Sequence, residues 1–203
     1  CNDTLLAKGY EAYCAVKEGI CNEAVEDIIE ANTYLSGIGF ESGGLSGAHS
    51  IHNGMTVLEE THKLLHGEKV AYGALTQLVL ENRPEEEVAD IARFCKKVGL
   101  PVTLKDLGLA DVTDDRLLEA AKETCKPDDT MVNMPFEVKP EDIVKVGEEI
   151  ETFVIRKWVV NPDAVRAKVE ASKGKPLPKS KWQQRLEEAQ KLQEQQMRNQ
   201  KRK

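Results

Sequence analysis

Apolar residues recur at helical spacing along most of the first 150 residues of the chain. This spacing predicts a run of helices, over Thr4–Val16, Asn22–Leu35, about 45–58, Val70–Leu80, Pro84–Gly99 and the residues after Thr113. No alternation with a period of two persists anywhere, so the pattern does not predict a sheet. The sequence therefore predicts an all-α, helical bundle-like domain over residues 1–150.

Local signals mark the ends of several of these predicted helices. Asn22 is a suitable N-cap for the helix that follows it, and Thr113 could cap the helix that contains Leu117. Pro84 precedes three glutamates, a combination that favours the start of a helix. The glycines within Gly37–Gly44 predict an interruption of the helical pattern.

The pattern changes beyond residue 150. Residues 151–172 predict a short helical connector, and the glycine and two prolines of Lys173–Lys179 predict a linker. Residues 173–203 are rich in Gln, Lys and Arg and carry a thin apolar stripe, so they predict a mobile, helix-prone basic tail. We therefore expect three parts, 1–150, 151–172 and 173–203, the last an extended basic helical tail.

Charge is divided unevenly between the body and this tail. Residues 153–203 carry 14 Lys and Arg against 5 Asp and Glu, a net charge of +9. The remaining 14 basic and 30 acidic residues give residues 1–152 a net charge of −16, so the chain as a whole has a net charge of −7. This asymmetry is typical of an acidic folded body with a basic arm, whose expected partners are polyanions.

Two further features exclude other classes of protein. No apolar run reaches the 18 or so residues of a membrane span, and Cys1-Asn2-Asp3-Thr4 is no export signal, so we expect no membrane span and a cytoplasmic location. The five cysteines are odd in number and form no CxxC pair, which favours reduced thiols over a disulfide framework. The missing initiator Met suggests a fragment.

All four histidines fall in one short window, as His49, His52, His62 and His66. Neutral imidazole is a common ligand of zinc and iron, and two helices that meet at a bend could bring His49 and His66 together. Gly43, Gly44, Gly47 and Gly67 flank these pairs and could permit a close backbone approach. The alternative is that the histidines are ordinary surface or capping residues, because no nearby carboxylate is an obvious third ligand.

The segments from Gly37 to Gly54 and from His62 to Val70 resemble the C-terminal helical domain of glycerol dehydrogenases, in the iron-containing (group III) alcohol dehydrogenase family. The resemblance extends through Cys95–Pro101 and Asn133–Phe136 and covers residues 1–150. It implies NAD-dependent oxidation of a glycerol-like polyol to dihydroxyacetone, with one divalent metal ion, zinc or iron, bound by an Asp and two His. Association into an oligomer stays open.

The resemblance also implies roles for individual residues. His49 and His66 match the two His ligands of the metal, and Phe40 matches an aromatic residue of the substrate pocket. His52, one turn from the first ligand, is the expected catalytic residue. The Asp ligand and the nucleotide-binding domain are expected upstream of residue 1, and no G-x-G-x-x-G motif replaces that domain. We therefore expect this chain alone to be inactive as a dehydrogenase.

Residues 153–203 resemble a different protein, the cytoplasmic tail of a YidC/Oxa-type membrane insertase. The resemblance lies in the tail motif from Lys179 to Ala189. It implies a fusion near residues 149–152 and an alternative function, in which the tail binds the ribosome or RNA through Lys179, Lys181, Trp182 and Arg185. A solvated tail without a tight partner is the other interpretation.

Overall fold

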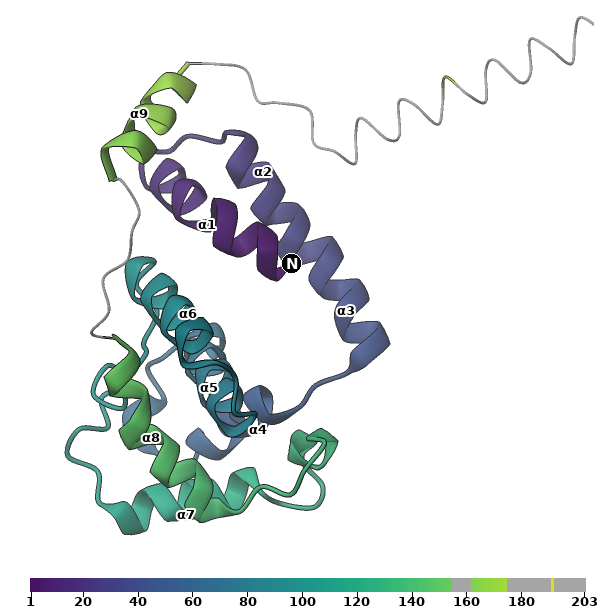
Figure 1. Cartoon of the computed structure of the whole chain (residues 1–203), viewed down its shortest axis with the longest axis vertical. Helices are drawn as coiled ribbons and strands as arrows, with labels where there is room; N and C mark the ends of the chain where they lie inside the picture. The colour runs from purple at the N-terminus through teal and green to yellow at the C-terminus, as the bar shows by residue number, and fades with distance from the viewer. Residues whose placement is uncertain (155–161, 175–190, 192–203) are drawn as a thin grey trace, which may run out of the picture. The chain divides into compact units, whose positions relative to one another are not determined.

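A computed structural model describes residues 1–154, 162–174 and 191 of the chain. The helices are α1 (Asn2–Lys17), α2 (Glu23–Glu30), α3 (Ser36–Gly43), α4 (Gly47–Met55), α5 (His66–Leu80), α6 (Glu85–Lys97), α7 (Asp114–Thr124), α8 (Pro140–Val154) and α9 (Pro162–Ser172) (Figure 1). These residues include no β-strand, so the predicted all-α class is confirmed. None of the helices in the described ranges is long and apolar enough to cross a membrane. Nearly all of the predicted basic tail lies outside the described residues.

The local signals for helix ends have mixed outcomes. Asn22 is the N-cap of α2, and its side-chain oxygen accepts a hydrogen bond from the backbone N–H of Val25 at 3.1 Å. Pro84 directly precedes α6, whereas Thr113 precedes α7 without a capping hydrogen bond from its side chain.

The predicted interruption within Gly37–Gly44 is wrong. A π-helical turn, Ala31–Leu35, joins α2 to α3, and the helix ends only at Gly43. A glycine costs a helix interior only about 1 kcal/mol, which is too little to stop a helix that already extends from α2.

The described chain divides into two compact units. One comprises Cys1–Ile38 and continues from Asn161, and the other is Gly39–Val160. In the first unit, α1 and α2 are consecutive helices packed side by side, and α1 also contacts α9. One cluster of buried apolar side chains in this unit consists of Ala12, Ala15, Ala24, Val25 and Val169. The predicted division into 1–150, 151–172 and 173–203 stays a prediction.

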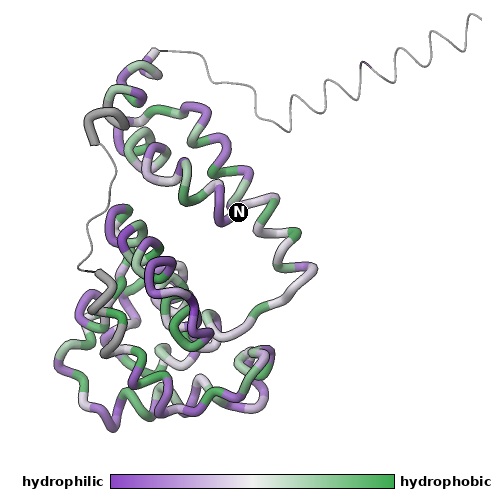
Figure 2. Tube along the Cα trace, viewed as in Figure 1, coloured by the Kyte–Doolittle hydropathy of each residue, from purple (hydrophilic) through white to green (hydrophobic). Residues whose placement is uncertain are grey.

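The second unit is built around α4. This short helix packs against α5 and α7, and α8 packs against α5, α6 and α7. Hydrophobic and hydrophilic residues are interspersed along α4, α5, α6 and α7 (Figure 2), so each of these helices can turn an apolar face inward. Ile51, Leu75, Leu107 and Ile150 are among the residues that are completely or almost completely buried in this core.

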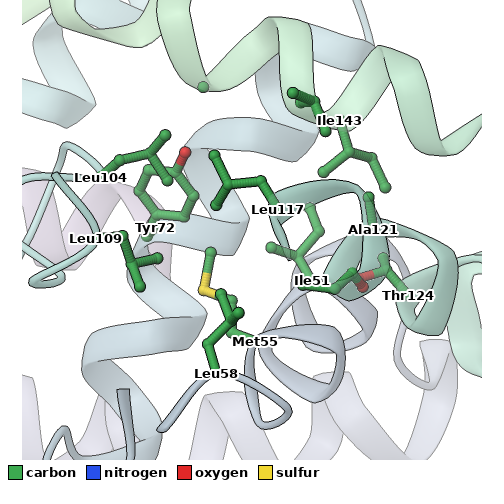
Figure 3. A pocket seen from close by; sticks show the side chains of 13 residues that line it. Ile51, Met55, Leu58, Tyr72, Leu104, Leu109, Leu117, Ala121, Thr124 and Ile143 are labelled. Carbon is green, nitrogen blue, oxygen red and sulfur yellow. The ribbon is translucent and has the colours of Figure 1, made fainter. Parts of the chain in front are cut away.

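A small cavity of about 40 Å³ lies in this core (Figure 3). Side chains from α4, α5, α7 and α8 line it, and Ile51, Tyr72 and Leu117 point toward one another across it. Among the side chains that the structure describes, those that line the cavity are uncharged and mostly apolar. One water molecule needs only about 10–15 Å³, so water would fit, but the apolar lining makes the cavity a packing feature of the core.

Two glycines set the position of α4 between its neighbours. A Cβ on Gly73 of α5 would overlap the carbonyl oxygen of Ala48, and a Cβ on Gly54 would overlap Thr124 and the carbonyl oxygen of Ala120 in α7. The helix backbones can approach this closely only because both residues lack a side chain. The close packing fixes α4, which carries His49 and His52.

Candidate metal centre

Three of the four histidines lie together at the junction of α4 and α5. His49 and His52 are one turn apart in α4, and His66 is the first residue of α5. The ring centroids of His49 and His66 are 5.5 Å apart, and those of His52 and His66 are 4.3 Å apart. The structure thus places the two predicted metal ligands side by side, although their role as ligands stays a prediction.

The fourth histidine, His62, takes a different part in the structure. Its Nε2 atom lies 2.8 Å from the carbonyl oxygen of Thr56, so this nitrogen must carry the proton and donate it. This hydrogen bond stabilises the turn after α4, so His62 has a structural role. The window of four histidines therefore separates into a group of three and a single turn residue.

The glycines around the histidines also divide into two kinds. A Cβ at Gly47 would lie 3.1 Å from the sulfur of Met134 and 3.3 Å from Oε1 of Gln77. A Cβ at Gly43, Gly44 or Gly67 would meet nothing within 4 Å. The expected close approach is therefore found at Gly47, whereas Gly67 shows none within its own compact unit.

A polar network supports α4 beside the three histidines. Asp129 precedes a 3₁₀ helix, Thr130–Asn133, that lies against α4. Its carboxylate accepts hydrogen bonds from the Ser50 hydroxyl, from Nδ2 of Asn53 at 3.0 and 3.3 Å, and from the backbone N–H of Thr130 at 2.6 Å. The Thr130 hydroxyl in turn donates to the carbonyl oxygen of Ser46 at 3.0 Å. No motif in the sequence around Asp129 indicates this network.

The environment favours neutral imidazoles on α4. Burial lowers the pKa of His49, and the neighbouring rings of His66 and His52 lower it further. Burial also lowers the pKa of His52, more than its hydrogen bond to Asn53 raises it. Neutral imidazole is the form that binds a metal ion. Both shifts of the pKa therefore favour the neutral ring.

Asp129 stays ionised beside them. Burial raises the pKa of its carboxyl group, but the hydrogen bonds from Ser50, Asn53 and Thr130 lower it by more. The carboxylate is therefore a permanent hydrogen-bond acceptor at neutral pH.

The remaining predicted site residues do not join this group. Phe40 lies in α3, is about half exposed, and makes no hydrogen bond or ring contact with the three histidines in the structure as described. Lys179, Lys181, Trp182 and Arg185 lie outside the described residues.

The described residues hold no cluster of three or more His, Cys, Asp or Glu side chains that could bind a metal ion. Both ring nitrogens of His52 have partners within the protein, Asn53 at 2.9 Å and His66 at 3.1 Å. Of the two predicted ligands, His66 has one ring nitrogen engaged by His52, and the metal-binding role of both His49 and His66 stays a prediction.

Comparison with known proteins places this geometry in context. The chain is 57% identical over 143 residues to glycerol dehydrogenase from Citrobacter freundii, and the alignment covers 70% of this chain and 39% of that protein. Glycerol dehydrogenase from Thermotoga maritima is 49% identical over 143 residues, with the same coverage of both chains. This chain is a relative of the glycerol dehydrogenases.

Solved structures agree with this relationship. The crystal structure of a probable glycerol dehydrogenase from Sinorhizobium meliloti 1021 matches with a TM-score of 0.72 and 43% identity, covering 75% of this chain and 43% of that chain. The glycerol dehydrogenase matches together support the group III dehydrogenase family that the sequence predicted. No protein-family model matches the chain.

The extent of the matches matters for function. The chain spans about two-fifths of the length of the glycerol dehydrogenases named above. The comparisons do not support the resemblance of residues 153–203 to an insertase tail or the ribosome as a partner. What the complete enzyme does is therefore a proposal for this chain.

Proposed function

We propose that this chain is the helical, metal-binding part of an NAD-dependent dehydrogenase that oxidises glycerol or a similar polyol to dihydroxyacetone or its analogue. The observation that carries the proposal is the 5.5 Å separation of the His49 and His66 rings, in a chain of which 70% aligns with a glycerol dehydrogenase. His49 and His66 hold one divalent ion, zinc or iron, and Phe40 lines the substrate pocket. The cytoplasmic location stays a prediction.

The spacing of the two rings fits a shared metal ion. With metal–nitrogen distances of about 2.0–2.1 Å and tetrahedral angles, two imidazole ring centres lie about 5 Å apart. The observed separation of 5.5 Å is close to this value. Burial keeps His49 neutral, and His66 has one ring nitrogen without a partner in the described residues. The donor set thus fits two positions of a metal site, and an Asp upstream of residue 1 is the proposed third ligand.

The chain's own residues prepare the site for the oxidation. A divalent ion held by His49 and His66 would supply Lewis acidity, which would lower the pKa of a substrate hydroxyl. His49 and His66 fix the place where that hydroxyl binds, because α4 is held tightly between α5 and α7. Both ring nitrogens of His52 have hydrogen-bond partners, so His52 orients the ring of His66 through a hydrogen bond and is not itself a proposed metal ligand. The oxidation would also need a hydride acceptor, and the proposed acceptor is NAD, which another part of the complete enzyme would hold.

Calorimetric titration with zinc tests the assignment of the ligands. We expect weak binding by the 203-residue chain and an affinity at least tenfold lower in His49→Ala and in His66→Ala, because each variant loses one of two ligands. His62→Ala is the matched control, since it removes a histidine from the same window but outside the group of three. Equal affinities in the wild type and His49→Ala would refute the proposed centre.

A further inference from the structure

A continuous line of hydrogen bonds joins a carboxylate on one segment to a predicted metal ligand on another. It starts at Asp129, passes to Nδ2 of Asn53 at 3.0 Å, and leaves Asn53 through Oδ1, which lies 2.9 Å from Nδ1 of His52. Nε2 of His52 then lies 3.1 Å from Nδ1 of His66. Four side chains from three segments are thus connected in series.

The chemistry of the first member fixes the direction of every bond in the series. A carboxylate only accepts, so Asn53 must turn its amide N–H₂ toward Asp129 and its oxygen toward His52. An amide oxygen also only accepts, so Nδ1 of His52 must carry a proton and donate it. In a neutral ring the other nitrogen, Nε2, is then an acceptor, and Nδ1 of His66 must donate to it.

Reversing the direction of these hydrogen bonds would place two hydrogen-bond acceptors against each other. If His52 carried its proton on Nε2 instead, the lone pair of Nδ1 would face the amide oxygen of Asn53 across 2.9 Å. If the Asn53 amide were flipped, its oxygen would face both oxygens of the Asp129 carboxylate. Each arrangement replaces a hydrogen bond with two facing acceptors and is disfavoured by the loss of that bond and by repulsion.

We propose that Asp129 and Asn53 are positioning residues that set the tautomer of His66 through His52, so that Nε2 of His66 carries a free lone pair. In the neutral ring the proton then sits on Nδ1, which faces His52. The metal part of this proposal rests on the proposed function, because Nε2 is the atom that would bind the ion. An N–H donated from the far side of a ligating imidazole fixes its orientation and raises its basicity.

The same structure supplies an internal reference. His62 donates through Nε2 to the carbonyl oxygen of Thr56, so it must adopt the opposite tautomer. One spectrum of the folded chain should therefore contain both neutral forms, assigned to named residues. This contrast distinguishes the effect of the hydrogen-bond series from Asp129 to His66 from any general preference of histidine for one tautomer.

Long-range ¹H–¹⁵N correlation spectra of the ¹⁵N-histidine-labelled, metal-free 203-residue chain test the proposal, since they distinguish Nδ1–H from Nε2–H. We expect Nδ1–H for His52 and His66 and Nε2–H for His62. In Asn53→Ala, His52 loses its acceptor, and we expect both His52 and His66 to gain the Nε2–H form. Zinc affinity should fall about 10–100-fold, as for other partners of ligating histidines.

Ser50→Ala is the matched control, because Ser50 donates to the same Asp129 carboxylate but lies outside the series. It should lower stability and leave both tautomers unchanged. Nε2–H on His66 in the wild type, or unchanged tautomers in Asn53→Ala, would overturn the proposal. If the tautomers were as expected but the zinc affinity did not change in His49→Ala and His66→Ala, the proposed setting of the His66 tautomer would hold and the proposed function would be refuted.

Discussion

Replacement of Gly54 by alanine tests the packing that holds the candidate centre in place. An added Cβ would overlap Oγ1 of Thr124 and the carbonyl oxygen of Ala120, and would lie 3.0 Å from Cβ of Thr124. Thr124 is almost completely buried, and its hydroxyl donates to the carbonyl oxygen of Ala120 at 3.0 Å. The backbones of α4 and α7 must therefore move apart to admit one methyl group.

The magnitude follows from two opposing effects. Alanine in place of a helical glycine stabilises a helix by about 0.5–1 kcal/mol. Overpacking of a tight interface costs about 1–3 kcal/mol, and a Thr124 hydroxyl turned away from its acceptor would cost about 1–3 kcal/mol more. We expect Gly54→Ala to lower the free energy of unfolding by about 2 kcal/mol, which corresponds to about 4–8 °C in melting temperature for a chain of this size.

Urea unfolding followed by circular dichroism at 222 nm measures this change as a shift of the midpoint at constant slope. Gly67→Ala is the matched control, because Gly67 also lies in a helix of the second unit and a Cβ there would meet nothing within 4 Å. We expect the control to be unchanged or more stable by up to about 1 kcal/mol. If both variants were stabilised equally, the close approach of α4 to α7 would be wrong.

Two further predictions concern ionisable groups. The folded-state pKa of Asp129 is lowered, so the contribution of its carboxylate to stability is present above the unfolded-state pKa of about 3.9 and is lost as the pH falls further. Between pH 7 and pH 3, the midpoint of urea unfolding should therefore fall more in the wild type than in Asp129→Asn. Parallel curves for the two proteins would contradict this prediction. Burial raises the pKa of Cys95 to about 11, so iodoacetamide at pH 8 should modify exposed Cys1 long before Cys95 in the native chain, and both in urea, as peptide mass spectrometry would show.

Features that depend on neighbouring residues were predictable from the sequence. Asn22 caps α2 through a bond that spans only three residues, and the helical spacing of apolar residues predicted α1, α2 and α4 to α7. The wrong prediction at Gly37–Gly44 has the same origin, because the local preference of glycine does not include the stability of the helix that precedes it. α8 begins at Pro140, which is followed by two acidic residues, the same signal that correctly marked Pro84, although the apolar pattern did not predict this helix.

The candidate site could be predicted only in part from residues that are close together in the sequence. The density of histidines pointed to His49 and His66, and their ring separation is compatible with that prediction. Which histidines face each other could not be read from spacing, since His62 and His66 share a helical spacing but His62 lies before α5 begins. Asp129 could not be found at all, because nothing near it in the sequence indicates that it lies against Ser50 and Asn53.

The connection from Asn53 to Asp129 has a consequence for the order in which the site assembles. His52 and His66 are separated by 14 residues and meet through the local pair α4 and α5, whereas Asn53 and Asp129 are separated by 76 residues. Contacts of low sequence separation form early, and those that close long loops form late. During synthesis His52 and His66 can therefore meet well before Asp129 leaves the ribosome. The later contact between Asn53 and Asp129 then sets which ring nitrogen of each histidine carries the proton.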